Sequence, residues 1–228
     1  MIHGTGGALA AIDNLGQIGE SLAYPPKSIG TFVSLMSIWN FLGRITAGFA
    51  SEILLARYKL PRPLLLSLVL LLSCVGHLLV AFDAPNSLYF ASVIIGFCSG
   101  AQNPLLFVII SELFGLKHYS TLYNFGAMAS PIGSYVFNVR VAGHLYDREA
   151  AKQGALLSSK AKYSACKGVQ CYKLSFIIIT VATLLGALVM VVLVWRTWGF
   201  YKGDVYARYK NEEEMAIVEE QLKGENLQ

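Results

Sequence analysis

Four charged side chains in or beside long apolar stretches are the residues best placed to do chemistry in this 228-residue chain. Arg44 lies within one apolar stretch, Glu52 and Arg57 follow it, and Glu112 lies near the end of a later one. A charged side chain at membrane depth is costly, and it is usually paired or faces a water-filled cavity. We therefore expect Arg44 to pair with Glu52 or Glu112. The alternative is an Arg44 side chain that extends to the membrane surface.

Amide, hydroxyl and small residues recur along these stretches at helical spacing, which places them on single helix faces. Pro104 removes a backbone hydrogen bond one turn earlier, which predicts a broken helix of the kind that lines transporter cavities. The alternative for any one small residue is simple helix packing. The members of the three stripes are Ser34, Ser37, Asn40 and Gly43; Ser92, Gly96, Ser99 and Asn103, with Gln102 beside them; and Asn124, Pro131, Ser134 and Asn138.

The elements that must position these side chains are transmembrane helices. The chain is 55% hydrophobic and 14% charged, whereas soluble domains are about 25% charged. Several apolar runs reach the roughly 20 residues that a helix needs to cross a bilayer. We expect an all-α integral, multi-pass membrane protein over residues 1–199 and a charged cytosolic tail over 200–228. The expected spans are 1–22, 28–50, 63–82, 87–114, 119–139 and 174–195, the first read as the end of a longer helix.

Other classes of function lack their motifs. The chain has no HExxH, GxSxG, Walker A or GxGxxG sequence, so we expect no enzyme, no cofactor and no metal. The net charge of +4 lies in loops, where it orients membrane proteins. A basic stripe with interleaved aromatics is absent, so no nucleic acid is expected.

Two cysteines lie close together between the last two spans. Cys166 and Cys171 frame the sequence CKGVQC. They predict either a disulfide on an oxidising side of the membrane or two reduced thiols in a cytosolic loop. The disulfide is the preferred interpretation, and it makes the loop 140–173 non-cytosolic. Cys74 and Cys98 lie inside spans and are expected to be buried.

Several strings resemble a known family. The sequence FLGR at 41–44, then Gly48, Glu52 and Arg57, is similar to the loop motif of the major facilitator superfamily, although the usual Gly-Arg-Arg continuation is replaced by RYKLPR at 57–62. Longer strings resemble the plant nodulin-like, nuclear-fusion-defective-type transporters. They are AIDNLGQIGESL at 11–22, GAQ at 100–102, ISELFGLKHY at 110–119, NFG at 124–126, ASPIGS at 129–134, VRVAG at 139–143 and LYD at 145–147.

The resemblance implies the C-terminal six-helix half of a twelve-helix major facilitator fold, with five full spans after a shortened first one. It places the loop 140–173 outside the cytosol. It also implies alternating access, in which two halves rock about a midplane site. A cytoplasmic gate would contain Gly48, Glu52 and Arg57, with Arg44 and Glu112 as a charge pair. Cavity residues would be Asp13, Asn14, Gln17, Asn40, Gln102, Asn103, Asn124, Pro131, Ser134 and Asn138.

The function expected is secondary active transport of a small polar solute. A non-transporting membrane receptor or regulatory protein on the same fold is the alternative. The expected partners are the lipid bilayer, a small-molecule solute with or without a coupled proton, and an N-terminal half from the same gene or from a partner chain. The sequence does not distinguish the plasma membrane from an intracellular one, and it does not name the solute.

Overall fold

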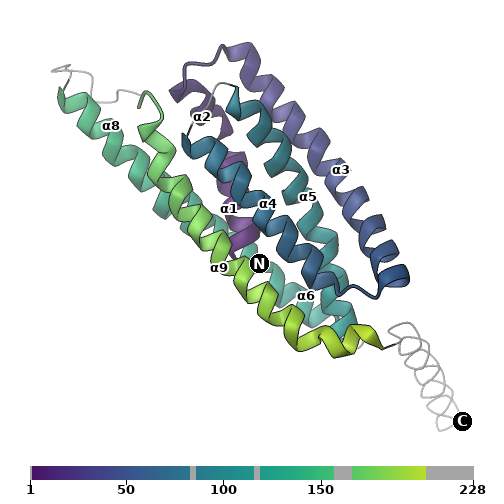
Figure 1. Cartoon of the computed structure of the whole chain (residues 1–228). Coiled ribbons are helices and arrows are strands. Elements are labelled where there is room, and N and C mark those ends of the chain that lie inside the picture. Colours follow the sequence, from purple (N-terminus) through teal and green to yellow (C-terminus); the bar gives the residue numbers. More distant parts are fainter. Residues whose placement is uncertain (1, 83–85, 116–118, 157–165, 204–228) are drawn as a thin grey trace, which may run out of the picture.

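The computed structural model describes residues 2–82, 86–115, 119–156 and 166–203, and all regular elements in these ranges are helices. They pack side by side as an elongated bundle, with α3 along one flank and α9 along another (Figure 1). Their bounds are α1 Ile2–Asp13, α2 Leu15–Ser21, α3 Pro26–Tyr58, α4 Arg62–Phe82, α5 Ser87–Phe114, α6 Tyr119–Ala127, α7 Ala129–Ser134, the π-helix η1 Tyr135–Gly143, α8 His144–Leu156 and α9 Gln170–Lys202.

Three of these helices are long and apolar enough to cross a membrane, namely α4, α5 and α9. They are candidate spans by length and composition, and they overlap three of the expected spans. The helix α3 has 33 residues, but it carries more polar side chains. The spans expected over α1–α2, α3 and α6–η1 remain predictions.

Small residues bring α3 and α5 into close contact. A β-carbon at Gly43 would meet the backbone carbonyl of Phe97, and one at Gly100 would meet the carbonyl of Asn40. A β-carbon at Gly96 would lie 2.6 Å from the carbonyl oxygen of Met36. Glycine at these positions lets two helix backbones approach without side chains between them. Helix packing, the simpler interpretation, therefore accounts for Gly43 and Gly96, the glycines in the stripes of small and polar residues.

Two of the helices are interrupted. A single turn residue, Asn14, separates α1 from α2, and another, Met128, separates α6 from α7. The second break lies one turn before Pro131, which has no amide hydrogen to donate to the carbonyl of Ala127. Beyond α7 the chain continues as the nine-residue π-helix η1, a rare form that is frequent at functional sites.

Two expectations about the chain path are wrong. The helix α5 runs without a break through Pro104, since it is packed against α3 on one side and α4 on the other. The segment 140–173, expected to be a loop, is helical over η1 and α8 as far as Leu156. No proline interrupts residues 140–156, and α8 packs against both η1 and α9.

A short disulfide-closed turn fastens the ends of α2, α8 and α9. Cys166 and Cys171 form a disulfide, with Cα atoms 5.9 Å apart. Between them, the Gly168 amide donates to the Ser21 carbonyl of α2 at 2.7 Å. The Gln153 side chain of α8 both donates to the Lys167 carbonyl and accepts from its amide, each at 2.9 Å. The Cys166 amide also donates to the Tyr146 hydroxyl of α8 at 3.2 Å. The disulfide closes the turn, and four hydrogen bonds attach the turn to α2 and α8.

We expect Gly100→Ala to destabilise the protein by roughly 1–3 kcal/mol, because the added methyl group must push α3 away from α5. Thermal unfolding of the purified protein in detergent measures this change. The matched control is Gly30→Ala on α3, where a β-carbon meets nothing within 4 Å. The control should leave the melting temperature unchanged or slightly higher. Equal destabilisation by both variants would contradict the close packing of α3 on α5.

Candidate functional site

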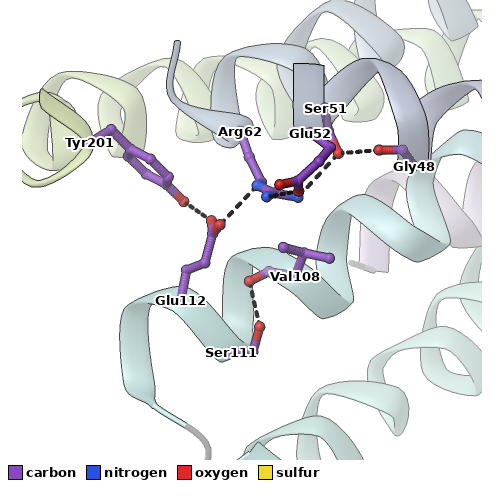
Figure 2. Close-up of polar contacts among 8 residues, drawn as sticks. All are labelled: Gly48, Ser51, Glu52, Arg62, Val108, Ser111, Glu112 and Tyr201. Atoms are coloured by element: carbon purple, nitrogen blue, oxygen red, sulfur yellow. Dashed lines mark hydrogen bonds and ion pairs between the residues drawn. The ribbon is translucent and has the colours of Figure 1, made fainter. Parts of the chain in front are cut away.

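A buried charge cluster joins four helices at one end of the bundle (Figure 2). Arg62, the first residue of α4, places its Nη2 2.7 Å from Oε2 of Glu52 on α3 and its Nε 2.8 Å from Oε1 of Glu112 on α5. Its Nη1 donates to the Ser51 hydroxyl at 3.2 Å. The Tyr201 hydroxyl of α9 donates to Oε2 of Glu112 at 2.8 Å. One guanidinium therefore connects the ends of α3, α4 and α5, and Glu112 connects them to α9.

The members of this cluster differ in their exposure to solvent. The side chains of Arg62 and Glu112 are only 5% and 2% exposed, whereas that of Glu52 is 53% exposed. A buried ion pair is costly to break, because the remaining charge has no water to solvate it. An exposed pair contributes little. Stability should therefore depend on the Arg62–Glu112 pair, while Glu52 can exchange partners at low cost.

The structure changes the expected pairing. Glu112 pairs with Arg62, not with Arg44, whose Nε instead donates to the Asn40 side chain at 3.2 Å. Arg57 is exposed, so the basic position of the loop motif is taken by Arg62, ten residues after Glu52. Sequence reasoning missed Arg62, although it is the last basic residue of the altered RYKLPR segment. Nothing in the sequence marked Tyr201 as a partner of Glu112, apart from its position in a helix end rich in aromatic residues.

A second polar cluster surrounds the break between α1 and α2. The Asn14 side-chain amide donates to Oδ1 of Asn138 at 2.6 Å, and Asn138 donates in turn to Oδ2 of Asp13 at 2.9 Å. The Asn14 side-chain amide also donates to the Ala10 carbonyl at 2.7 Å, which the Asn14 backbone amide contacts too, at 3.3 Å. The structure thus brings three of the expected cavity residues together between a helix break and a π-helix.

Gln17 extends this polar region along α2. Its Oε1 accepts a hydrogen bond from the Tyr172 hydroxyl of α9 at 2.9 Å. The Tyr172 ring lies 5.3 Å from that of Tyr146 on α8. The polar region therefore borders on the disulfide-closed end of the bundle, and the charge cluster of Arg62 lies at the opposite end (Figure 1).

The remaining expected cavity residues do not join either cluster. Gln102 is buried beside Gly4, and its Nε2 lacks a hydrogen-bond partner within the described residues. It lines a cavity of about 180 Å³ whose other walls come from α1, α4, α5 and α9 and are aliphatic except for His3, Gly4 and Gly186. Asn40, Asn103 and Ser134 are half-buried, and Asn124 and Pro131 are exposed.

Long apolar helices, a buried charge network and a discontinuous helix lined by amides together define a helical membrane protein. Broken helices line solute pathways in some helical membrane proteins.

The chain belongs to the family described as "NFD4, C-terminal domain", whose model matches residues 1–202. It is similar to a "Probable transporter MCH1" of Yarrowia lipolytica (strain CLIB 122 / E 150), with 31% identity over 177 residues, 73% of this chain and 34% of that protein. A "Probable transporter MCH1" of Wickerhamomyces anomalus is 25% identical over 138 residues, 60% of this chain and 28% of that protein. No solved structure matches the chain.

These matches confirm the nuclear-fusion-defective part of the expected resemblance, since the family model covers residues 1–202. The chain spans about a third of the length of the curated relatives that it matches. The plant group within the family and the six-helix count of the half remain predictions.

We expect Arg62→Leu to destabilise the protein by about 3–5 kcal/mol, because it leaves the Glu112 carboxylate buried without a counter-charge. Tyr201→Phe should cost less, about 1.5–3 kcal/mol, for one hydrogen bond to a charged group. Unfolding curves in detergent check both values. Arg57→Leu is the matched control and should shift stability by less than about 0.5 kcal/mol. If Arg57→Leu destabilised the protein as much as Arg62→Leu, the assignment of Arg62 as the partner of Glu112 would be wrong.

Proposed function

We propose that this chain is the C-terminal half of a secondary active transporter that moves a small polar solute across a membrane by alternating access. The observation that carries the proposal is the break between α1 and α2, where Asp13 and Asn14 meet Asn138 on the π-helix. Side chains at such a break are already oriented away from regular helix packing. They can exchange their mutual hydrogen bonds for bonds to a solute.

The charge cluster supports a gate at the other end. Rocking of two halves requires contacts at a helix end that can open and close again. The Glu52 carboxylate is half exposed, so water can solvate it when it leaves Arg62, while the buried Arg62–Glu112 pair persists. In this proposal Arg62 takes the gate role that the sequence analysis gave to Arg57. Gly48 contributes its backbone carbonyl, which accepts a hydrogen bond from the Ser51 hydroxyl.

The exposed side of α3 supports the proposal that a second set of helices packs against it. Five large apolar side chains recur on it at helical spacing and lie open in the described structure: Ile38, Leu42, Ile45, Phe49 and Ile53. Curated relatives are about three times as long as the part that this chain matches. We propose that an N-terminal half, from the same gene or from a partner chain, closes the pathway and leaves α4 and α9 facing lipid. A proton can accompany the solute through Asp13.

Uptake by the full-length protein tests this function even though the solute is unidentified. Cells that overproduce the protein and cells that lack it are compared for small polar metabolites that accumulate or disappear, and each candidate is then tested in proteoliposomes. We expect Asp13→Asn and Asn138→Ala to reduce uptake at least tenfold, because each removes part of the proposed solute site.

The matched control is Asp147→Asn, an exposed carboxylate on α8 outside this cluster, which should transport normally. If no metabolite difference appears and no proteoliposome uptake occurs, the non-transporting receptor or regulatory protein becomes the better description. Normal uptake by Asn138→Ala would instead remove the broken helix from the solute pathway.

A further inference from the structure

The cavity beside Gln102 lies apart from both polar clusters. It has a volume of about 180 Å³ and is enclosed by residues of α1, α4, α5 and α9. Gly4, on its α1 wall, is nine residues before Asp13, which corresponds to about 13 Å at 1.5 Å per residue. The cavity is therefore a separate feature of the bundle, which neither the Asn14 cluster nor the Arg62 cluster uses.

The cavity also lies far from the ends of the long helices. Gln102 is ten residues before Glu112 on α5, a distance of about 15 Å along the helix. On α4, Leu70 is eight residues after Arg62, a distance of about 12 Å. The apolar core of a bilayer is about 30 Å thick. In a membrane crossed by α4, α5 and α9, which are long and apolar enough for this, the Gln102 side chain is near the middle of the bilayer.

The Gln102 side chain has an unused hydrogen-bond donor. The residue is 1% exposed, and its Nε2 has no hydrogen-bond partner among the described residues. A β-carbon at Gly4 would lie 2.6 Å from Oε1 of Gln102, so glycine at this position leaves room for the carboxamide between α5 and α1. A buried donor without a partner is costly, and few are found in native structures. A ligand with an acceptor oxygen would remove that cost.

Water alone does not suit this cavity. A volume of 180 Å³ corresponds to about six water molecules of roughly 30 Å³ each, and every buried water needs at least two polar partners. Gln102 and His3 are the polar side chains of the wall, and its other side chains are apolar: Leu66, Leu70, Leu106, Leu185, Val189 and Met190. Engineered apolar cavities of about 150 Å³ stay dry and bind benzene. The size and lining therefore suit one small, mainly apolar molecule.

The α9 wall of the cavity also faces outward. Leu185 and Val189 line the cavity and are 54% and 65% exposed. They belong to the exposed apolar side of α9, which is a candidate span. A molecule dissolved in the hydrocarbon core of the bilayer can therefore reach the cavity beside α9 without crossing a polar barrier.

We propose that this cavity binds a small lipophilic molecule that carries one acceptor oxygen, such as a cyclic ketone, and that enters from the bilayer. Its hydrocarbon part fills the space among the leucines, and its oxygen accepts a hydrogen bond from Nε2 of Gln102. A lipid tail would fill the same space but leave the Gln102 donor unpaired, so the acceptor distinguishes the two occupants. The inference goes beyond the proposed transport function, and it assigns Gln102 to a site other than the solute cavity expected from the sequence.

Photolabelling of the full-length protein in proteoliposomes tests this site. The probes are a cyclohexanone and a methylcyclohexane that carry the same diazirine, used at equal concentrations in the membrane, and mass spectrometry locates the labelled residues. We expect the ketone to label the cavity wall, at Leu106 or Met190, and excess cyclohexanone to displace it. Methylcyclohexane should be about three- to tenfold less effective as a competitor, because it cannot accept the hydrogen bond from Gln102.

Two variants separate the acceptor from the space. Gln102→Leu should lower labelling by the ketone to the level of the hydrocarbon probe, while labelling by the hydrocarbon probe persists and reports an intact cavity. Leu106→Phe adds bulk to the cavity wall and should reduce labelling by both probes at least tenfold. Leu188→Phe is the matched control, because Leu188 is on the exposed side of α9 and outside the cavity wall. It should leave labelling of the cavity unchanged.

Three results would overturn the proposal. The ketone could label no residue of the cavity, cyclohexanone and methylcyclohexane could compete equally, or the advantage of the ketone could persist in Gln102→Leu. Equal competition would mean that the cavity takes lipid tails. The competition experiment uses the unaltered protein, so it decides the proposal even where a variant does not fold. No transport is measured, so the outcome does not depend on the proposed solute pathway.

Discussion

The pairing of Arg62 with Glu112 is the interaction on which the arrangement of the helix ends depends. Both side chains are almost fully buried, so neither charge can be left without the other. Because Arg62 begins α4 and Glu112 lies near the end of α5, the pair fixes where these helices meet. Glu52 and Tyr201 then attach α3 and α9 to the same point. A single charge cluster thus sets the relative height of four helices.

The opposite end of the bundle is held differently. A disulfide-closed turn lies there, and hydrogen bonds from it to the Ser21 carbonyl of α2 and the Gln153 side chain of α8 fasten the helix ends. The helices α1 and α2 are separated at Asn14. Between the two ends, close glycine contacts hold α3 against α5, and the buried charged side chains of the described residues, Arg62 and Glu112, lie in the end cluster. Motion at one end can therefore be coupled to the other through rigid helices, with the polar break at Asn14 as the point where geometry can change. This division fits the alternating access that we propose for the protein.

The apolar helices could be predicted well from the sequence. A continuous run of leucine and valine, such as that of α4, is stable only in a helix that is buried or that faces lipid. Local breaks were predicted less well. Pro131 lies one turn after an interruption, but Pro104 does not interrupt α5, where tertiary packing overrides the local preference. At the break, Asn14 contacts Asn138, 124 residues away, and no local pattern predicts a contact over that distance. The partner of Glu112 was misassigned for the same reason, since several basic residues lie within reach along the chain and only packing selects Arg62.

The central claim is that the charge cluster and the broken helix are two ends of one transport cycle. The most direct measurement is the rate at which Gln17→Cys, in the full-length protein, reacts with a membrane-impermeant thiol reagent, with and without Glu52→Gln. Glu52→Gln removes the exposed ion pair with Arg62 and leaves the buried Arg62–Glu112 pair in place. It should favour the state in which the distant end is closed, so labelling at Gln17→Cys should slow severalfold. An unchanged or faster rate in the folded Glu52→Gln protein would contradict the coupling of the two ends.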